Sequence, residues 1–275
     1  MSTVPPQPQS TSIAKRLRWR GTLRERYMVR ATLQAENLKK KYGRKTVVKD
    51  VSLQMESGQI IGLLGPNGAG KTTMFYMIVG FIKADGGRIL LNGRNVTTLP
   101  MYSRSRLGLS YLPQEPSIFR KLSVEDNLKL VIETRDDLTR GEKKESIEAL
   151  IEEFGLQGVR KQYGYTLSGG ERRRTEIARA LASNPLFLLL DEPFAGIDPK
   201  AVYEIKKLIK SLAERGIGIL LTDHNVRDTL EITHQSLIIN EGEILASGKR
   251  SDLLQNEEAR RIYFGDDFSN EGGLT

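Results

Sequence analysis

Short apolar runs, each about the length of one β-strand, alternate along the chain with segments whose apolar residues return every three or four positions. The run Phe187–Leu190 is apolar throughout, which is typical of a strand buried on both faces of a parallel sheet. Other strand-like runs lie at residues 33–38, 47–53, 59–64, 88–91, 107–112, 217–221, 236–240 and 243–246, the last two forming a predicted hairpin. Strands that alternate with helices predict an α/β fold with a mostly parallel sheet.

The segment 123–163 has helical rather than strand periodicity. Ser123 and Asp126 have the spacing of a helix N-terminal cap, and apolar residues recur at helical spacing as far as Phe154. The strand–helix alternation resumes after this segment. We therefore expect an inserted α-helical subdomain at about residues 115–165.

Composition narrows the class of protein. The 275 residues predict one large domain or about two smaller ones, and 39% hydrophobic residues suffice for a core. No run approaches the ~20 apolar residues of a membrane helix, and the first residues lack the apolar stretch of a signal peptide. The chain has no cysteine and only two histidines, His224 and His234, which argues against disulfides and zinc sites and fits a cytoplasmic protein.

The net charge of +8 comes mostly from the N-terminus. Residues 1–30 hold seven basic side chains and one acidic one, whereas the rest of the chain holds 35 and 33. We expect residues 1–32 to be a basic, disordered extension, either a solvated tail or a helix on an anionic membrane surface. Translation that begins at Met28 is a third interpretation. Because the body is nearly neutral, we expect no nucleic-acid partner.

A glycine-rich phosphate loop follows the apolar run at 59–64. Its glycines let backbone N–H groups surround a polyphosphate, and the following helix adds its positive end. Lys71 supplies a charge for the β- and γ-phosphates, and the Thr72 hydroxyl is a ligand for Mg²⁺. The alternative is a glycine-rich turn without a ligand. The loop consists of Gly65, Pro66, Asn67, Gly68, Ala69, Gly70, Lys71 and Thr72.

Two further motifs carry chemistry. Asp191 and Glu192 end an apolar strand, where ligands of parallel sheets bind, so Asp191 is a candidate for Mg²⁺ and Glu192 for the general base. Ser168-Gly169-Gly170, followed by Glu171, has the features of a second anion site at a helix N-terminus. A capping box between Ser168 and Glu171 is the structural alternative.

These motifs, in this order, resemble the nucleotide-binding domain of ABC transporters over about residues 33–265. Other matching elements are Gln114 after a strand, the segment 195–198, His224 after a strand, and Tyr42, which precedes Lys71 by 29 positions. The resemblance implies a P-loop NTPase fold. Such a fold has a RecA-like parallel core, an N-terminal antiparallel β subdomain and the helical insertion. Residues 266–275 are expected to be a flexible tail.

The resemblance also implies ATP and Mg²⁺ as cofactors and a head-to-tail homodimer, in which Ser168 and Gly170 of one copy close on the ATP of the other. Glu192, His224, Gln114 and Lys71 are then the expected catalytic residues. Thr72, Gln114 and Asp191 are the expected metal contacts. The expected nucleotide contacts are Tyr42, Gly65, Pro66, Asn67, Gly68, Ala69, Gly70, Lys71, Thr72, Thr73, Ser168, Gly169, Gly170 and Asp198.

Within the ABC family, several longer segments look like the ATPase subunit of bacterial lipopolysaccharide exporters. They are residues 112–124, 167–174, 191–199, 222–226 and 263–268. That resemblance implies a cytoplasmic, peripheral subunit that binds two different transmembrane permease subunits at the inner membrane. Phe119 and Leu122 would line the groove for a permease helix, or would simply pack within the subdomain. Tyr263 and Phe264 would help two copies interlock, or would pack on their own core.

Two other functions remain open from the sequence. The chain has the layout of a branched-chain amino-acid importer ATPase, which would keep the chemistry and change the cargo. A soluble ABC ATPase of translation or DNA repair is less favoured, since the chain has one such domain and no sustained heptads.

Overall fold

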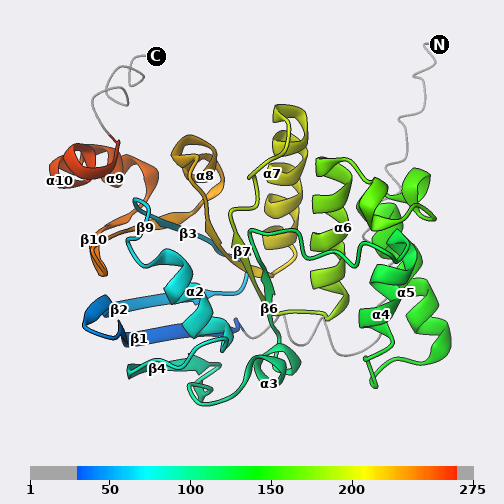
Figure 1. The fold of residues 1–275 in the computed structure, drawn as a ribbon, viewed down its shortest axis with the longest axis horizontal. Coiled ribbons are helices and arrows are strands. Elements are labelled where there is room, and N and C mark those ends of the chain that lie inside the picture. The colour runs from blue at the N-terminus through cyan, green and yellow to red at the C-terminus, as the bar shows by residue number, and fades with distance from the viewer. Residues whose placement is uncertain (1–29, 265–275) are drawn as a thin grey trace, which may run out of the picture.

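The structure is a computed structural model that describes residues 30–264. The predictions for the basic extension, for Met28 and for the tail at 266–275 therefore lie outside the described residues. The two sheets and the helices that pack beside them have the α/β architecture that the sequence predicts (Figure 1).

The central sheet has six strands in the order β10-β9-β3-β8-β7-β6. The pairs β3–β8, β3–β9, β7–β8 and β6–β7 are parallel, whereas β9 and β10 form the antiparallel hairpin predicted from the sequence. Because the four parallel pairs share one direction, their carboxyl ends meet at one edge of the sheet. The strands are β3 (Ile60–Leu64), β6 (Leu109–Leu112), β7 (Phe187–Asp191), β8 (Gly218–Thr222), β9 (Gln235–Asn240) and β10 (Glu243–Gly248).

A second, antiparallel sheet is formed by the N-terminal part of the described chain, in the order β2-β1-β4-β5. Its first two strands make a long hairpin around Gly43 and Arg44, so the predicted strands at 33–38 and 47–53 each extend further than the apolar pattern indicates. The strands are β1 (Thr32–Tyr42), β2 (Lys45–Glu56), β4 (Gly86–Leu91) and β5 (Arg94–Asn95).

The helices lie on several sides of the two sheets (Figure 1). Helix α2 lies beside the antiparallel sheet, and α4 and α5, drawn in green, lie at the opposite end of the molecule beyond α6. Helices α4 and α5 fall within the range 115–165, whose boundaries stay a prediction. The helices are α2 (Lys71–Val79), α3 (Met101–Arg106), α4 (Val124–Ile132), α5 (Arg140–Glu153), α6 (Gly169–Ala182), α7 (Pro199–Glu214), α8 (Val226–Ile232), α9 (Arg250–Gln255) and α10 (Glu257–Ala259).

The apolar run in β7 is explained by burial on both faces. Leu188 and Leu190 pack in the cluster formed with α4 to α7, whereas Phe187 and Leu189 pack in the cluster formed with α2 and the antiparallel sheet. Alternate residues thus enter two different cores. A third cluster holds Phe264, with Tyr263 packed against it, so both aromatics contact their own core.

Two predicted helix caps are present. The Ser123 hydroxyl accepts a hydrogen bond from the Asp126 amide at 3.0 Å. At α6, Ser168 and Glu171 form a full capping box, in which the Glu171 carboxylate accepts from the Ser168 amide at 2.9 Å. Each cap satisfies backbone donors that a helix start leaves unpaired.

Candidate functional site

The phosphate loop runs from the end of β3 to the start of α2, against β9 and β2. A Cβ added at Gly65 would lie 2.1 Å from the Ile239 carbonyl oxygen, and one at Gly70 would lie 2.9 Å from that of Val47. Gly70 also has a φ of 111°, in the left-handed region, where it caps α2. A side chain at either position would therefore displace the loop from the sheets that hold it.

Lys71 folds back into this loop. Its ammonium group donates to the carbonyl oxygens of Gly65 at 2.6 Å and Pro66 at 3.1 Å, and the residue is only 7% exposed. Burial lowers the pKa of Lys71, while the charges of Glu192 and Asp191 act in the opposite direction. Thr72, in the first turn of α2, is exposed.

Asp191 ends β7 and is 3% exposed. One of its carboxylate oxygens accepts a hydrogen bond from the Thr222 hydroxyl at 2.6 Å, and the other accepts from the Tyr111 hydroxyl at 3.2 Å. Thr222 ends β8 and Tyr111 lies in β6, the two neighbours of β7. Both donors are neutral hydroxyls, and together they fix the carboxylate relative to the two neighbouring strands.

Glu192 is held by two residues from neighbouring loops. One carboxylate oxygen accepts from the Gln114 amide at 2.6 Å, and the other lies 2.6 Å from the His224 Nε2. Burial raises the pKa of Glu192, and the charge of His224 opposes that rise. The backbone of Glu192 has a φ of 47°, a left-handed conformation that costs a non-glycine residue about 1–2 kcal/mol.

Arg173 holds the backbone around this strained residue. Its guanidinium donates to the carbonyl oxygens of Asp191, Glu192 and Pro193, each at 3.1 Å, and to that of Pro113, which precedes Gln114. The side chain is buried, so these bonds satisfy its donors away from water. Arg173 thereby fixes the segment that carries Glu192 relative to the segment that carries Gln114.

The donor set fits Mg²⁺ rather than a zinc-type ion. A buried carboxylate (Asp191), an exposed hydroxyl (Thr72) and an amide oxygen (Gln114) are the hard oxygen ligands that Mg²⁺ prefers. Residues 30–264 contain no group of three or more His, Cys, Asp or Glu side chains placed to hold a metal by themselves.

Three further predicted residues, Tyr42, Ser168 and Asp198, lie elsewhere on the surface. Tyr42, at the end of β1, is 49% exposed, and the Lys40 ammonium lies 5.6 Å from the centre of its ring. Ser168 and Asp198 are exposed caps of α6 and α7. A Cβ added at Gly169 would lie 3.3 Å from the Gly196 carbonyl oxygen, so residues 168–170 pack against the loop before α7. No described contact joins these residues to Lys71 of the same chain.

Sequence reasoning missed Tyr111, Thr222 and Arg173 as contributors to the site. Tyr111 and Thr222 are polar residues near the carboxyl ends of otherwise apolar strands, where ligands of parallel sheets bind, and this position could have marked them as site residues. Arg173 gives no such signal, because it stands in a run of three arginines of which it alone is buried. His234, predicted to be an ordinary residue, accepts a hydrogen bond from the Ile60 amide at 2.9 Å.

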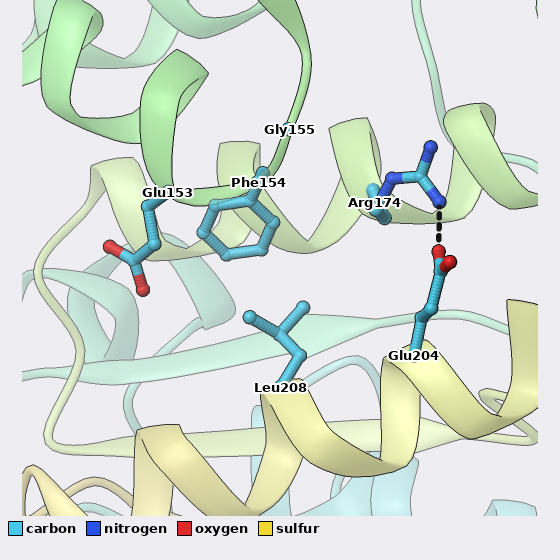
Figure 2. Close-up of a pocket in the computed structure, with 6 residues that line it drawn as sticks. All are labelled: Glu153, Phe154, Gly155, Arg174, Glu204 and Leu208. Carbon is cyan, nitrogen blue, oxygen red and sulfur yellow. Dashed lines mark hydrogen bonds and ion pairs between the residues drawn. The ribbon is translucent and has the colours of Figure 1, made fainter.

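A cavity of about 400 Å³ lies away from these residues, where α5, α6 and α7 meet (Figure 2). The ring of Phe154 and the side chain of Leu208 approach each other in its middle, and an ion pair between Arg174 and Glu204, 2.9 Å long, bounds one side. No predicted site residue lines it.

Across residues 30–264, the structure has no helix of the length and apolar character required to cross a bilayer.

Comparison with known proteins identifies the family. The family model described as ABC transporter matches residues 48–195. The lipopolysaccharide export system ATP-binding protein LptB of Escherichia coli (strain K12) is 52% identical over 238 residues, which are 86% of this chain and 99% of that protein. The protein of the same name from Haemophilus influenzae is 52% identical over 236 residues, 86% of this chain and 98% of that one.

Solved structures agree with this assignment and with the predicted fold. The ADP conformation of MJ1267, an ATP-binding cassette of an ABC transporter, is 27% identical and matches with a TM-score of 0.76, covering 86% of this chain and 99% of that chain. The resemblance inferred from the motifs is thus confirmed. The chain belongs to the ABC transporter family, as an ATP-binding subunit.

Proposed function

We propose that this chain is the ATP-hydrolysing subunit that powers lipopolysaccharide export, moving lipopolysaccharide out of the inner membrane by cycles of dimer closure and reopening. The cargo assignment is supported by the names of relatives that match almost from end to end. The chemistry is supported by one arrangement above all: the Glu192 carboxylate lies between Gln114 and His224. Glu192 directly follows Asp191 at the end of β7, and β8 alone separates β7 from β3, the strand that leads into the phosphate loop.

The residues of the chain divide the work as follows. The amides of the phosphate loop and the Lys71 ammonium bind the ATP phosphates, and Tyr42 stacks on the adenine. Glu192 accepts a proton from the attacking water, and a carboxylate whose pKa is raised by burial suits that task. His224 orients the γ-phosphate. Mg²⁺, which Thr72, Gln114 and Asp191 would hold, neutralises phosphate charge when it is bound.

A second copy completes the site. Ser168, Gly169 and Gly170 present the N-terminus of α6, which favours an anion, yet they have no described contact with Lys71 of their own chain. In a head-to-tail homodimer, this end would close on the phosphates bound by the partner, and Asp198 would lie between the two sites. ATP then acts as the bridge that holds two copies together.

Membrane association would come from partners. Phe119 is 47% exposed beside the helical segment, with the Arg179 guanidinium 5.1 Å from the centre of its ring, and exposed aromatics are favoured interface anchors. Together with Leu122, Phe119 would line a groove that receives a helix from one of the two transmembrane permease subunits, on the cytoplasmic face of the membrane.

Phe119→Ala should reduce assembly of the complex and leave nucleotide binding intact. Unchanged assembly would contradict this groove.

The test is purification of the tagged chain from detergent-solubilised membranes, with partners identified by mass spectrometry. Two different multi-span subunits with bound lipopolysaccharide are the expected result. A permease pair that works with a periplasmic binding protein would move the cargo to a nutrient, as in a branched-chain amino-acid importer. Recovery with ribosomes or DNA alone would overturn the transport function.

A further inference from the structure

Tyr111 lies at a junction of all three expected metal contacts. Its hydroxyl donates to Asp191, as described above. Its own segment continues three residues later into Gln114. Its ring packs on α2, the helix whose first turn carries Thr72.

The ring is held by an aromatic cluster. Phe75 and Tyr76, both in α2, contact it edge-to-face with centroids 6.4 and 6.2 Å away, and Phe81, just beyond α2, does so at 5.8 Å. Edge-to-face packing of three rings leaves the Tyr111 ring little freedom to tilt. Because the phenol is rigid, the position of its oxygen is set by these contacts.

The Asp191 carboxylate has two supports of different origin. The Thr222 hydroxyl comes from the adjacent strand β8 and moves with the sheet. The Tyr111 hydroxyl comes from β6 and is locked to α2 by the cluster. Of these two hydroxyls, that of Tyr111 belongs to the side chain whose ring packs on the helix that carries Thr72, so it bears on the distance between two of the expected Mg²⁺ contacts.

We propose that Tyr111 is a positioning residue for Mg²⁺: its hydroxyl orients the Asp191 carboxylate, and its ring ties that carboxylate to α2. The inference rests on the proposed function, since it presumes that Mg²⁺ binds here with ATP. Hydrogen-bond partners of metal-binding groups typically contribute about 10- to 100-fold to metal affinity. Asp191 keeps a second partner, so the lower end of that range is expected.

Tyr111→Phe removes the hydroxyl and keeps the ring. The measurement is binding of a fluorescent ATP analogue to the purified full chain, with Mg²⁺ and with EDTA. Affinity in EDTA should stay unchanged, whereas the gain in affinity that Mg²⁺ gives should fall about 10-fold. In steady-state assays, the Mg²⁺ concentration for half-maximal hydrolysis should rise by a similar factor, with kcat recovered at saturating Mg²⁺.

Phe81→Leu is the graded comparison, because it loosens the same cluster and keeps the hydroxyl. Its Mg²⁺ response should fall, but by less than that of Tyr111→Phe. An unchanged Mg²⁺ response in Tyr111→Phe would overturn the inference, and so would a parallel loss of affinity in EDTA. Failure of the proposed function is separate: the parent chain would not hydrolyse ATP, while the binding ratio would still report on Tyr111.

Discussion

Asp191 and Glu192 are adjacent carboxylates at the end of one strand, yet the fold treats them differently. Asp191 accepts from two hydroxyls that belong to neighbouring strands, so the sheet fixes its position. Glu192 has a left-handed backbone and is held by side chains of two loops. The comparison separates a carboxylate fixed by the sheet from one held by loop side chains, and the roles proposed for them, metal contact and general base, differ in the same way.

Removing the carboxylate held by loop side chains should have the largest effect. Glu192→Gln keeps the shape and hydrogen-bonding capacity of the side chain but cannot accept the proton. ATP hydrolysis, followed by phosphate release, should fall by about 100-fold or more, with ATP binding retained. The variant should accumulate as an ATP-bound dimer in size-exclusion chromatography. Hydrolysis close to the parent rate would show that another group is the base.

The charge of His224 should lower the pKa of Glu192. Since burial raises the pKa of Glu192, the active ionised form is lost as pH falls through that raised value, and kcat/KM should decline on its acid side. His224 opposes the rise, so His224→Gln should move this acid limb to higher pH. His234→Gln, which changes the other histidine, should leave the limb in place. A limb that does not move in His224→Gln would break the proposed coupling.

Removing a support of the carboxylate fixed by the sheet should appear as lost stability. In Thr222→Val, the buried Asp191 carboxylate loses a donor 2.6 Å away, which should lower the free energy of unfolding by about 2 kcal/mol. Thr229→Val is the control, because the Thr229 hydroxyl is equally buried and has no hydrogen-bond partner among the described residues. Urea denaturation measures both. Equal losses would mean that the hydroxyl bond contributes nothing specific.

The smallest effect on stability is expected for Glu125, a carboxylate outside the site, and it serves as a reference for the losses predicted above. Arg160 and Lys161 bind Glu125 and lower its pKa to about 2. Their stabilisation is therefore complete above pH 4.5, the ordinary value, and is lost as pH falls towards 2. Because the pair is partly exposed, Glu125→Gln should cost below about 1 kcal/mol at neutral pH and remove that acid dependence.

Its control is Glu133→Gln, since Glu133 is exposed and pairs with Lys129 at 3.7 Å. Urea denaturation at pH 7 and pH 3 should show no change of stability for this variant. A loss at pH 7 in Glu125→Gln that persists undiminished at pH 3 would contradict the ion-pair origin of the effect.

The sequence predicts what depends on neighbouring residues in the chain. Apolar runs give the strands, and the order of strand, glycine loop and helix places Lys71 correctly, since each depends on local spacing. It does not predict that Tyr111 meets Asp191, because that contact follows from β6 pairing with β7, and sheet order is set by crossover connections. The left-handed turn at Glu192 is also hidden, since no glycine marks it.

The inward fold of Lys71 has a consequence for turnover. Its ammonium group already donates hydrogen bonds to two carbonyl oxygens of the loop. Under the proposed function, an arriving phosphate would exchange one set of hydrogen bonds of Lys71 for another, and when it leaves, the two carbonyl oxygens would take its place. The buried Lys71 ammonium group would therefore keep hydrogen-bond partners after the nucleotide leaves, which lowers the free-energy cost of nucleotide release.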